Sequence, residues 1–458
     1  MEKHQQQKHD EAYQVLVLPY PIQGHINPML QFSKRLASKG LKVTLITTSK
    51  SMQPSASSIH FHSIDFQEAE TTTGIDEHIR LYESLIPARL AQFIEKHQIY
   101  SQHRAKVLVY DSCMPWALDV AKRLGLQGAS FFTQCWAVNA IFYHLKLGTL
   151  KVPSEEQIRT NAVVSLPSMP ELEISDLPSA AYDNSGSYPG LWNLIRRQFS
   201  NFQEADWTFC NTYDKLEHQI INWMASKWPI KTIGPTVPSM YLDKRLQDDD
   251  DYGLHLFKLH TDLCIEWLNS KETGSVIYVA FGSIAGLTEK QMGELTMGLK
   301  STKKHFLWVV RETEQNKLPS NFIEETSEKG LVSWSPQLDV LSHRAVGCFM
   351  THCGWNSTLE ALSIGVPMIA MPQWTDQMTN AKFVVDVWEV GIRVKKDGNG
   401  IITKEEIQRC VREVMEGERS LDIKRNSEKW RKLAIDAVDD GGSSDKNIEE
   451  FVAKITCN

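Results

Sequence analysis

The chain has 458 residues and a formal net charge of −7 at pH 7. A chain of this length is longer than one hydrophobic core usually serves, so we expect two domains. Its basic residues are scattered, which excludes the clustered basic surface of a nucleic-acid-binding protein. No apolar run approaches the ~18 residues that span a bilayer, so we expect no membrane span. The N-terminus lacks the apolar core of a signal peptide, and the eight cysteines show no CxxC pair. We therefore expect a cytoplasmic protein, and we expect it to be a monomer.

Strand-like apolar runs alternate with segments of helical periodicity along almost the whole chain, which is typical of parallel sheets flanked by helices. We therefore predict the α/β class. An amphipathic helix is expected from Pro28 to Ser38, after the first strand and a turn. The charged stretch 241–258 has little to bury, which predicts a linker between a domain at 1–240 and a domain at 259–440. Residues 441–458 are predicted to form a closing helix that packs back on the first domain.

The segment from Trp334 to Gln377 carries the strongest functional pattern. A buried strand is predicted to end at His352, and a helix follows it directly. Small and hydroxyl-bearing side chains leave backbone N–H groups open at the positive end of a helix, which is a site for phosphate. His352 could donate to the same anion. The first turn of this helix contains Gly354, Asn356, Ser357 and Thr358.

Further side chains of this segment suit the rest of a nucleotide sugar. Glu360 lies one helical turn beyond Ser357, where a carboxylate can accept from both hydroxyls of a ribose. Trp334 offers a flat face for a base, and Asp376 with Gln377 follows a strand end, where open parallel sheets bind ligands. Each residue alone also has an ordinary reading as core, helix cap or solvated helix face.

Together these residues resemble the signature box of the plant family 1 UDP-dependent glycosyltransferases. The matching motifs are WSPQ at 334–337, HCGWNS at 352–357, Glu360, and DQ at 376–377. PIQGHINP near the start, YDS and VAFGS extend the resemblance, which is greatest to the group acting on triterpenoids, steroids and small carboxylic acids. It implies a GT-B fold, with two Rossmann-like domains facing a central cleft. It also implies inverting transfer from a UDP-sugar co-substrate, with no cofactor.

The resemblance implies a role for each matching residue of the box. Trp334 would stack on uracil, the backbone of Ser335 and Gln337 would hold the nucleoside, and Glu360 would bind the ribose. Ser335 stands where the family more often has Ala or Cys, but this contact is made through the backbone. Gln377 favours UDP-glucose, since a His at that position tends to accompany galactose. The pyrophosphate would be met by Ser283, His352, Asn356 and Ser357, and the sugar by Trp355, Asp376 and Gln377.

A candidate general base lies in the first half of the chain. His25 follows the first predicted strand and Asp111 ends another, and such strand ends share one edge of a parallel sheet. A neutral imidazole suits removal of a proton from a hydroxyl near pH 7, and a carboxylate behind it fixes the tautomer. Taken alone, His25 is more often a turn residue and Asp111 a helix cap. Because the family has a catalytic His-Asp dyad, the resemblance favours the catalytic role for both. Gly24 and Thr133 are expected near the donor.

No metal ion is expected, because the helix N-terminus and Ser283 can meet the charge on the departing phosphate. The acidic run at 248–251 is interpreted as solvated linker. Resemblance to terpenoid and steroid enzymes favours a hydroxyl of an apolar steroid or triterpenoid as the acceptor, and ester formation on a small aromatic carboxylic acid is the alternative. An apolar acceptor pocket is expected from Met114, Trp116, Phe131, Trp136, Phe142, Tyr143, Tyr188, Trp192 and Trp374, although most of them also suit an ordinary core.

Other functional classes fit the sequence less well. A nicotinamide oxidoreductase lacks GxGxxG after the first strand, and a serine hydrolase lacks GxSxG. Neighbouring His352 and Cys353 lack the further ligands of a zinc site. A nucleotide-sugar-binding protein without turnover remains the alternative of another class, and the presence of both His25 and Asp111 argues against it.

Overall fold

The computed structural model describes residues 13–48, 58–68, 74–101, 103–182, 188–247, 249, 252, 261–283 and 286–457. The chain divides into two units. The first unit combines Met1–Phe132, Ser187–Phe209 and Lys446–Asn458, and the second combines Thr133–Gly186 and Cys210–Asp445. The domain limits that composition indicates, at residues 240 and 259, stay a prediction.

A parallel sheet forms the centre of the first unit, with strands in the order β3-β2-β1-β4-β5-β8. Its central strand β4 is an apolar run that is buried on both faces, as parallel strands covered by helices require. The strands are β1 (Gln14–Leu18), β2 (Lys42–Thr47), β3 (His60–Ser63), β4 (Ala105–Asp111), β5 (Gln127–Phe132) and β8 (Trp207–Cys210). The helices are α1 (Gln23–Ser38), α2 (Ile75–Tyr100), α3 (Trp116–Arg123), α6 (Pro189–Arg197) and α16 (Ser443–Thr456).

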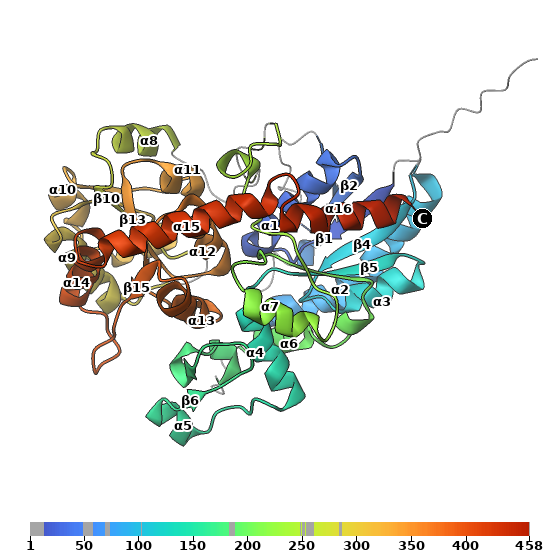
Figure 1. The fold of residues 1–458 in the computed structure, drawn as a ribbon, viewed down its shortest axis with the longest axis horizontal. Helices are drawn as coiled ribbons and strands as arrows, with labels where there is room; N and C mark the ends of the chain where they lie inside the picture. The colour runs from blue at the N-terminus through green and yellow to red at the C-terminus, as the bar shows by residue number, and fades with distance from the viewer. Residues whose placement is uncertain are drawn as a thin grey trace, which may run out of the picture. The chain divides into compact units, whose positions relative to one another are not determined.

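The last helix of the chain belongs to the first unit. In Figure 1 the red helix α16 lies beside the blue elements α1 and β1. Phe451 of α16 packs on Phe32 of α1 and on Phe209 of β8, with ring centroids 6.3 and 4.9 Å apart. The end of the chain therefore covers one face of the sheet formed by its beginning.

A second parallel sheet forms the centre of the second unit, in the order β12-β11-β10-β13-β14-β15. Both sheets confirm the predicted α/β class. The strands are β10 (Val276–Ala280), β11 (His305–Trp308), β12 (Gly330–Val332), β13 (Val346–Thr351), β14 (Met368–Ala370) and β15 (Gly391–Arg393). The helices are α8 (Thr261–Asn269), α9 (Glu289–Ser301), α10 (Phe322–Thr326), α11 (Gln337–Ser342), α12 (Trp355–Ile364), α13 (Gln377–Lys382), α14 (Lys404–Met415) and α15 (Ser420–Val438).

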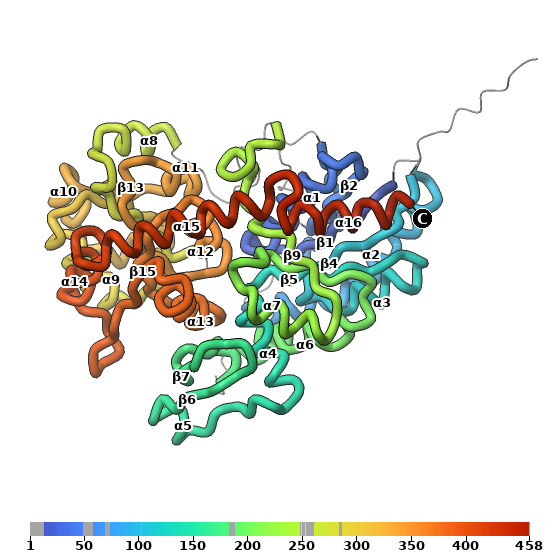
Figure 2. The backbone as a smooth tube through the Cα atoms, viewed as in Figure 1, coloured from blue at the N-terminus to red at the C-terminus, as the bar shows by residue number. Residues whose placement is uncertain are grey.

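A smaller part of the second unit gathers around a short antiparallel ribbon. Figure 2 shows α4, α5, β6 and β7 together, and a small apolar cluster including Ile141, Leu166 and Leu172 joins α4 to the two strands. The elements here are α4 (Trp136–Leu147), α5 (Glu155–Thr160), β6 (Val163–Val164) and β7 (Leu172–Glu173), followed along the chain by α7 (His218–Ala225) and β9 (Lys231–Thr232).

The stretch expected to be a solvated linker is partly buried. Asp249 is 4% exposed, and its carboxylate accepts the backbone N–H of Ser239 at 2.7 Å. The expectation is therefore wrong at this position, because the carboxylate satisfies the first N–H of the 3₁₀ turn Ser239–Tyr241. The rest of the acidic run, at 248, 250 and 251, lies outside the described residues.

Candidate active site

The candidate base lies in the first turn of α1. The helix begins at Gln23, five residues before the predicted start at Pro28. Pro28 removes only the donor that would bond the Gly24 carbonyl, so it does not prevent helix on its N-terminal side. The bonds from the N–H groups of His25 and Ile26 to the Ile22 carbonyl close the first turn. Gly24 is exposed beside His25.

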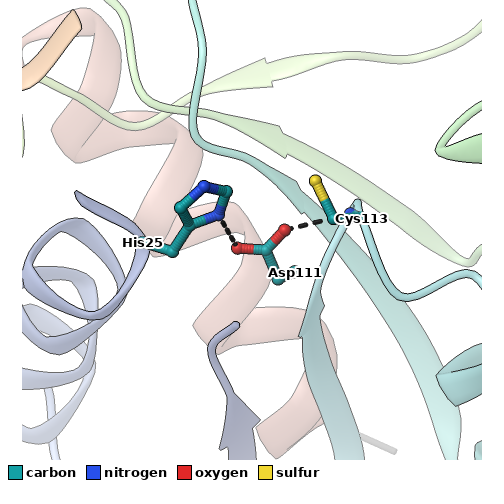
Figure 3. A group of neighbouring side chains, drawn as sticks. All are labelled: His25, Asp111 and Cys113. Atoms are coloured by element: carbon teal, nitrogen blue, oxygen red, sulfur yellow. Dashed lines mark hydrogen bonds and ion pairs between the residues drawn. The ribbon is translucent and has the colours of Figure 1, made fainter. Parts of the chain in front are cut away.

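The structure brings His25 into contact with Asp111, the last residue of β4. His25 Nδ1 and Asp111 Oδ2 are 2.5 Å apart, although 86 positions separate the two residues. The other carboxylate oxygen accepts the backbone N–H of Cys113 at 3.0 Å. Asp111 is fully buried, whereas 19% of the His25 side chain is exposed (Figure 3). The buried carboxylate is thus held by two donors, and the imidazole borders solvent.

This contact determines what the imidazole can do. A neutral histidine bonded to a carboxylate through Nδ1 carries its proton there, which leaves the lone pair on Nε2. Once Nε2 takes a proton, the imidazolium gains a charge-assisted hydrogen bond to Asp111. The pair therefore has the properties of a general base with an orienting acid.

The structure assigns part of the expected acceptor lining to the core. Met114 and Phe131 of the first unit are fully buried, and Phe131 packs on Phe32 with centroids 5.6 Å apart. Trp136 of the second unit is also fully buried. Thr133 directly follows β5 and is 5% exposed. By contrast, Tyr188 is 39% exposed.

A candidate anion site lies at the start of α12. Gly354 is the N-cap residue of α12, and among the described residues no side chain caps the N-terminus of this helix. The first-turn N–H groups therefore point outward without an intrahelical acceptor, at the positive end of the helix dipole. The first turn contains Trp355, Asn356 and Ser357. This arrangement suits a phosphate.

Two glycines make room for the His352 ring beside this helix start. A Cβ at Gly354 would stand 2.5 Å from His352 Nε2, and a Cβ at Gly282 would stand 2.7 Å from the same atom. Gly282 also has a φ of +74°, which other residues rarely adopt. Ser283 comes next in the loop after β10, and its carbonyl accepts from Arg311 at 2.8 Å.

His352 is uncharged near neutral pH. Burial lowers its pKa to about 4, and the opposing effect of the Ala280 carbonyl is smaller. A neutral imidazole approaches an anion as an N–H donor and adds no positive charge. The charge complementarity at this site therefore comes mainly from the α12 N-terminus.

Three side chains of the signature box form one hydrogen-bonded cluster. Gln337, at the start of α11, donates from Nε2 to Ser357 Oγ at 2.9 Å and to Glu360 Oε2 at 2.5 Å. Tyr252 donates its hydroxyl to Glu360 Oε1 at 2.8 Å. Glu360 is 4% exposed, so each carboxylate oxygen has a donor in place of water.

Burial determines the protonation of Glu360. It raises the pKa of this carboxyl to about 7, and the hydrogen bonds from Gln337 and Tyr252 oppose the rise. A carboxylate that titrates near neutrality accepts hydroxyl hydrogens fully only above that pH. Glu360 is thus both the acceptor expected for a ribose and a pH-sensitive group.

The tryptophans of the box occupy different environments. Trp355, which is expected at the sugar, is 4% exposed and donates its indole N–H to the Asn211 carbonyl at 2.7 Å, so its indole N–H already has a partner within the protein. Trp334 follows β12 and is partly buried. Ser335 is buried, with its hydroxyl 3.3 Å from that of Tyr278, so its side chain faces the protein.

Asp376 and Gln377 begin α13, beyond the end of β14. Asp376 accepts from Thr375 Oγ1 and Asn380 Nδ2, both at 2.9 Å. Gln377 Oε1 accepts the backbone N–H groups of Gln373 and Trp374 at 2.9 and 3.1 Å. The loop that presents both residues is therefore held by their own side chains.

Sequence reasoning missed two neighbours of the site. Tyr252 lies in a stretch interpreted as linker, and no local pattern predicts that its hydroxyl reaches Glu360. Cys113 was foreseeable, because it follows Asp111 by two positions at the same strand end.

Two parallel α/β sheets, with a histidine–aspartate pair at one and a helix start suited to an anion at the other, agree with a glycosyltransferase of the GT-B class. The family model "UDP-glucoronosyl and UDP-glucosyl transferase" matches residues 198–430, and "Glycosyltransferase, N-terminal domain" matches residues 11–175. UDP-glycosyltransferase 74E2 of Arabidopsis thaliana is 53% identical over 451 residues, covering 97% of this chain and 99% of that protein. Mogroside I-E synthase of Siraitia grosvenorii is 51% identical, covering 96% and 98%.

A solved structure agrees with these relatives. The crystal structure of Os79 from O. sativa in complex with UDP superimposes with a TM-score of 0.88 at 37% identity, covering 96% of this chain and 100% of that one. The chain belongs to the plant family 1 UDP-dependent glycosyltransferases. It is an enzyme that uses a UDP-sugar as co-substrate and no cofactor. Within the described residues, no helix has the length and apolar character that crossing a membrane requires.

Proposed function

We propose that this enzyme transfers glucose from UDP-glucose, with inversion, to a hydroxyl of a small apolar plant metabolite of the steroid or triterpenoid class. The observation that carries the reaction type is the 2.5 Å contact between His25 and Asp111. The acceptor class draws support from relatives: one is named Mogroside I-E synthase, and Os79 has been crystallised with U2F and a trichothecene. Gln377 supports glucose as the sugar.

In the proposed step, the acceptor oxygen attacks the anomeric carbon while His25 Nε2 takes the hydroxyl proton. The bond from the anomeric carbon to the phosphate oxygen breaks, and UDP leaves from the opposite face. Asp111 stabilises the imidazolium that forms. His25 returns the proton to solvent after the products leave.

The second unit is proposed to hold the donor. Backbone N–H groups at the start of α12, with His352 and Ser283, meet the growing charge on the leaving phosphate. Glu360 accepts the ribose hydroxyls in place of the Tyr252 hydroxyl, and Trp334 stacks on the base. Because the helix N-terminus and these fixed donors meet the charge that grows on the leaving phosphate, the proposed step uses no metal ion. We also propose that the enzyme acts as a cytoplasmic monomer.

Replacing His25 tests this proposal. His25→Ala is expected to lower kcat for a sterol or triterpenoid alcohol by a factor of about 100 or more, while the Kd for UDP, measured by calorimetry, stays within twofold. His60→Ala is the matched control, because His60 is an exposed histidine on β3. Turnover by His25→Ala at the wild-type rate would refute the mechanism.

An acceptor panel separates the alcohol from the carboxylic acid alternative. A carboxylic acid is already ionised near pH 7, so it needs no base to attack. His25→Ala should therefore lose much less activity on a salicylate-type acid than on a sterol. Mass spectrometry of products formed from UDP-glucose measures both. A wild-type preference for the acids would replace the proposed acceptor class with the ester-forming alternative.

A further inference from the structure

The end of β4 carries a third potential metal ligand beside the base. Potential ligand atoms of His25, Asp111 and Cys113 all lie within 4.8 Å of one another. Figure 3 shows the Cys113 side chain next to the carboxylate. Cys113 donates its backbone N–H to Asp111, its thiol also bonds that carboxylate, and the proposed transfer gives the thiol no step of its own.

This donor set matches one class of ion. Imidazole nitrogen, thiolate sulfur and carboxylate oxygen are the ligands of zinc and similar borderline-soft divalent metals, at about 2.0–2.3 Å. Two such ligands on a tetrahedral ion lie about 3.3–3.6 Å apart. The present His25–Asp111 contact of 2.5 Å would need to widen, and rotation of the partly exposed imidazole allows this.

The surroundings also suit a cation. Burial raises the pKa of the nearby Tyr20 hydroxyl, and Cys113, Asp111 and Glu83 add smaller electrostatic effects in the same direction. Arg197 is paired with Glu83, whereas the partner of Asp111 is the His25 imidazole and not a permanently charged side chain. Burial raises the pKa of the Cys113 thiol well above its ordinary value, so the thiol keeps its proton until a metal displaces it.

We propose that His25, Asp111 and Cys113 form an inhibitory site for zinc-like divalent metals at the catalytic base. The ion binds His25 Nδ1, an Asp111 oxygen and Cys113 Sγ, with water as the fourth ligand. The thiol proton is released to solvent, and the proton of Nδ1 is replaced by one on Nε2. Because Nε2–H cannot accept a proton, the bound ion stops transfer without touching the donor.

Inhibition of transfer by the ion rests on the proposed role of His25 as base, whereas binding of the ion does not. The experiment therefore measures both. Zinc is titrated into the full-length enzyme at saturating UDP-glucose. Wild type should be inhibited, and Cys113→Ala should need at least about tenfold more zinc for half-inhibition. Cys113→Ala should keep most of its turnover in the absence of zinc, because the His25 imidazole and the backbone N–H of residue 113 still hold the Asp111 carboxylate. Cys457→Ala is the control, since Cys457 is the exposed cysteine.

Cobalt reports binding independently of activity. Co²⁺ added to wild type should give a thiolate-to-cobalt charge-transfer absorption that is lost in Cys113→Ala and kept in Cys457→Ala. Cys113→Ser, which is nearly isosteric, serves the same comparison if the alanine variant fails to fold. Equal zinc sensitivity of wild type and the Cys113 variants, or a cobalt spectrum without a thiolate band, would overturn the site. Cobalt binding with undiminished turnover would keep the site and refute the role of His25 as base.

Discussion

Replacing the buried carboxylate at position 360 should make the enzyme more stable and a weaker binder of its donor. Glu360→Gln keeps the size of the side chain but removes the charge. Tyr252 can still donate to the new amide oxygen, and Gln337 can rotate its own amide to accept from the new NH₂ group. The hydrogen bonds therefore remain, and the change acts mainly through the charge.

The pKa of Glu360 sets the size of the effect. A rise from 4.5 to about 7 corresponds to about 3 kcal/mol of stability that the ionised group costs the folded state. A folded-state pKa above the unfolded value means that the folded protein binds more protons between these values. The free energy of unfolding therefore falls as pH rises from about 4.5 to 7, and the full cost applies above about 7.

Thermal unfolding and UDP binding test this reasoning together. At pH 8, Glu360→Gln should raise Tm by up to the equivalent of about 3 kcal/mol, and near pH 5 the gain should largely disappear. Loss of charge-assisted hydrogen bonds to the ribose should weaken UDP binding about 10- to 100-fold at pH 8. Glu95→Gln, an exposed position on α2, is the control. An equal Tm change at pH 5 and pH 8 would refute the argument.

Two further predictions concern the anion site and metal dependence. Gly354→Ala places a Cβ 2.5 Å from His352 Nε2, so the imidazole ring must move. The Kd for UDP-glucose, measured by calorimetry, should therefore rise about tenfold or more. An unchanged Kd would show that His352 does not bind the donor. EDTA should leave turnover of the metal-free enzyme unchanged, and a loss of activity that manganese restores would contradict the metal-free step.

Local pattern predicted the elements that carry the site. The alternation of apolar runs and helical segments indicated parallel sheets, because strands covered on both faces by helices are mainly apolar, as the part of β4 at residues 107–110 is. The WSPQ to DQ segment identified the family, since its motifs match the family's signature box at the same spacings. The start of α1 was placed too late, because Pro28 was taken as a first helical residue when it lies in the second turn.

The sequence by itself determined the fold class, the family and the residue types that the chemistry needs, because these depend on local periodicity and on a motif of fixed spacing. Only the tertiary structure decided the distances between segments. It placed His25 against Asp111, Tyr252 against Glu360, and Trp355 against the Asn211 carbonyl. It also decided which groups lose water, and burial is what moves the pKa values of Glu360 and His352. Strand-end topology and the family's dyad already predicted that His25 and Asp111 approach each other, but no local pattern encodes the other two contacts, which join residues far apart in the chain.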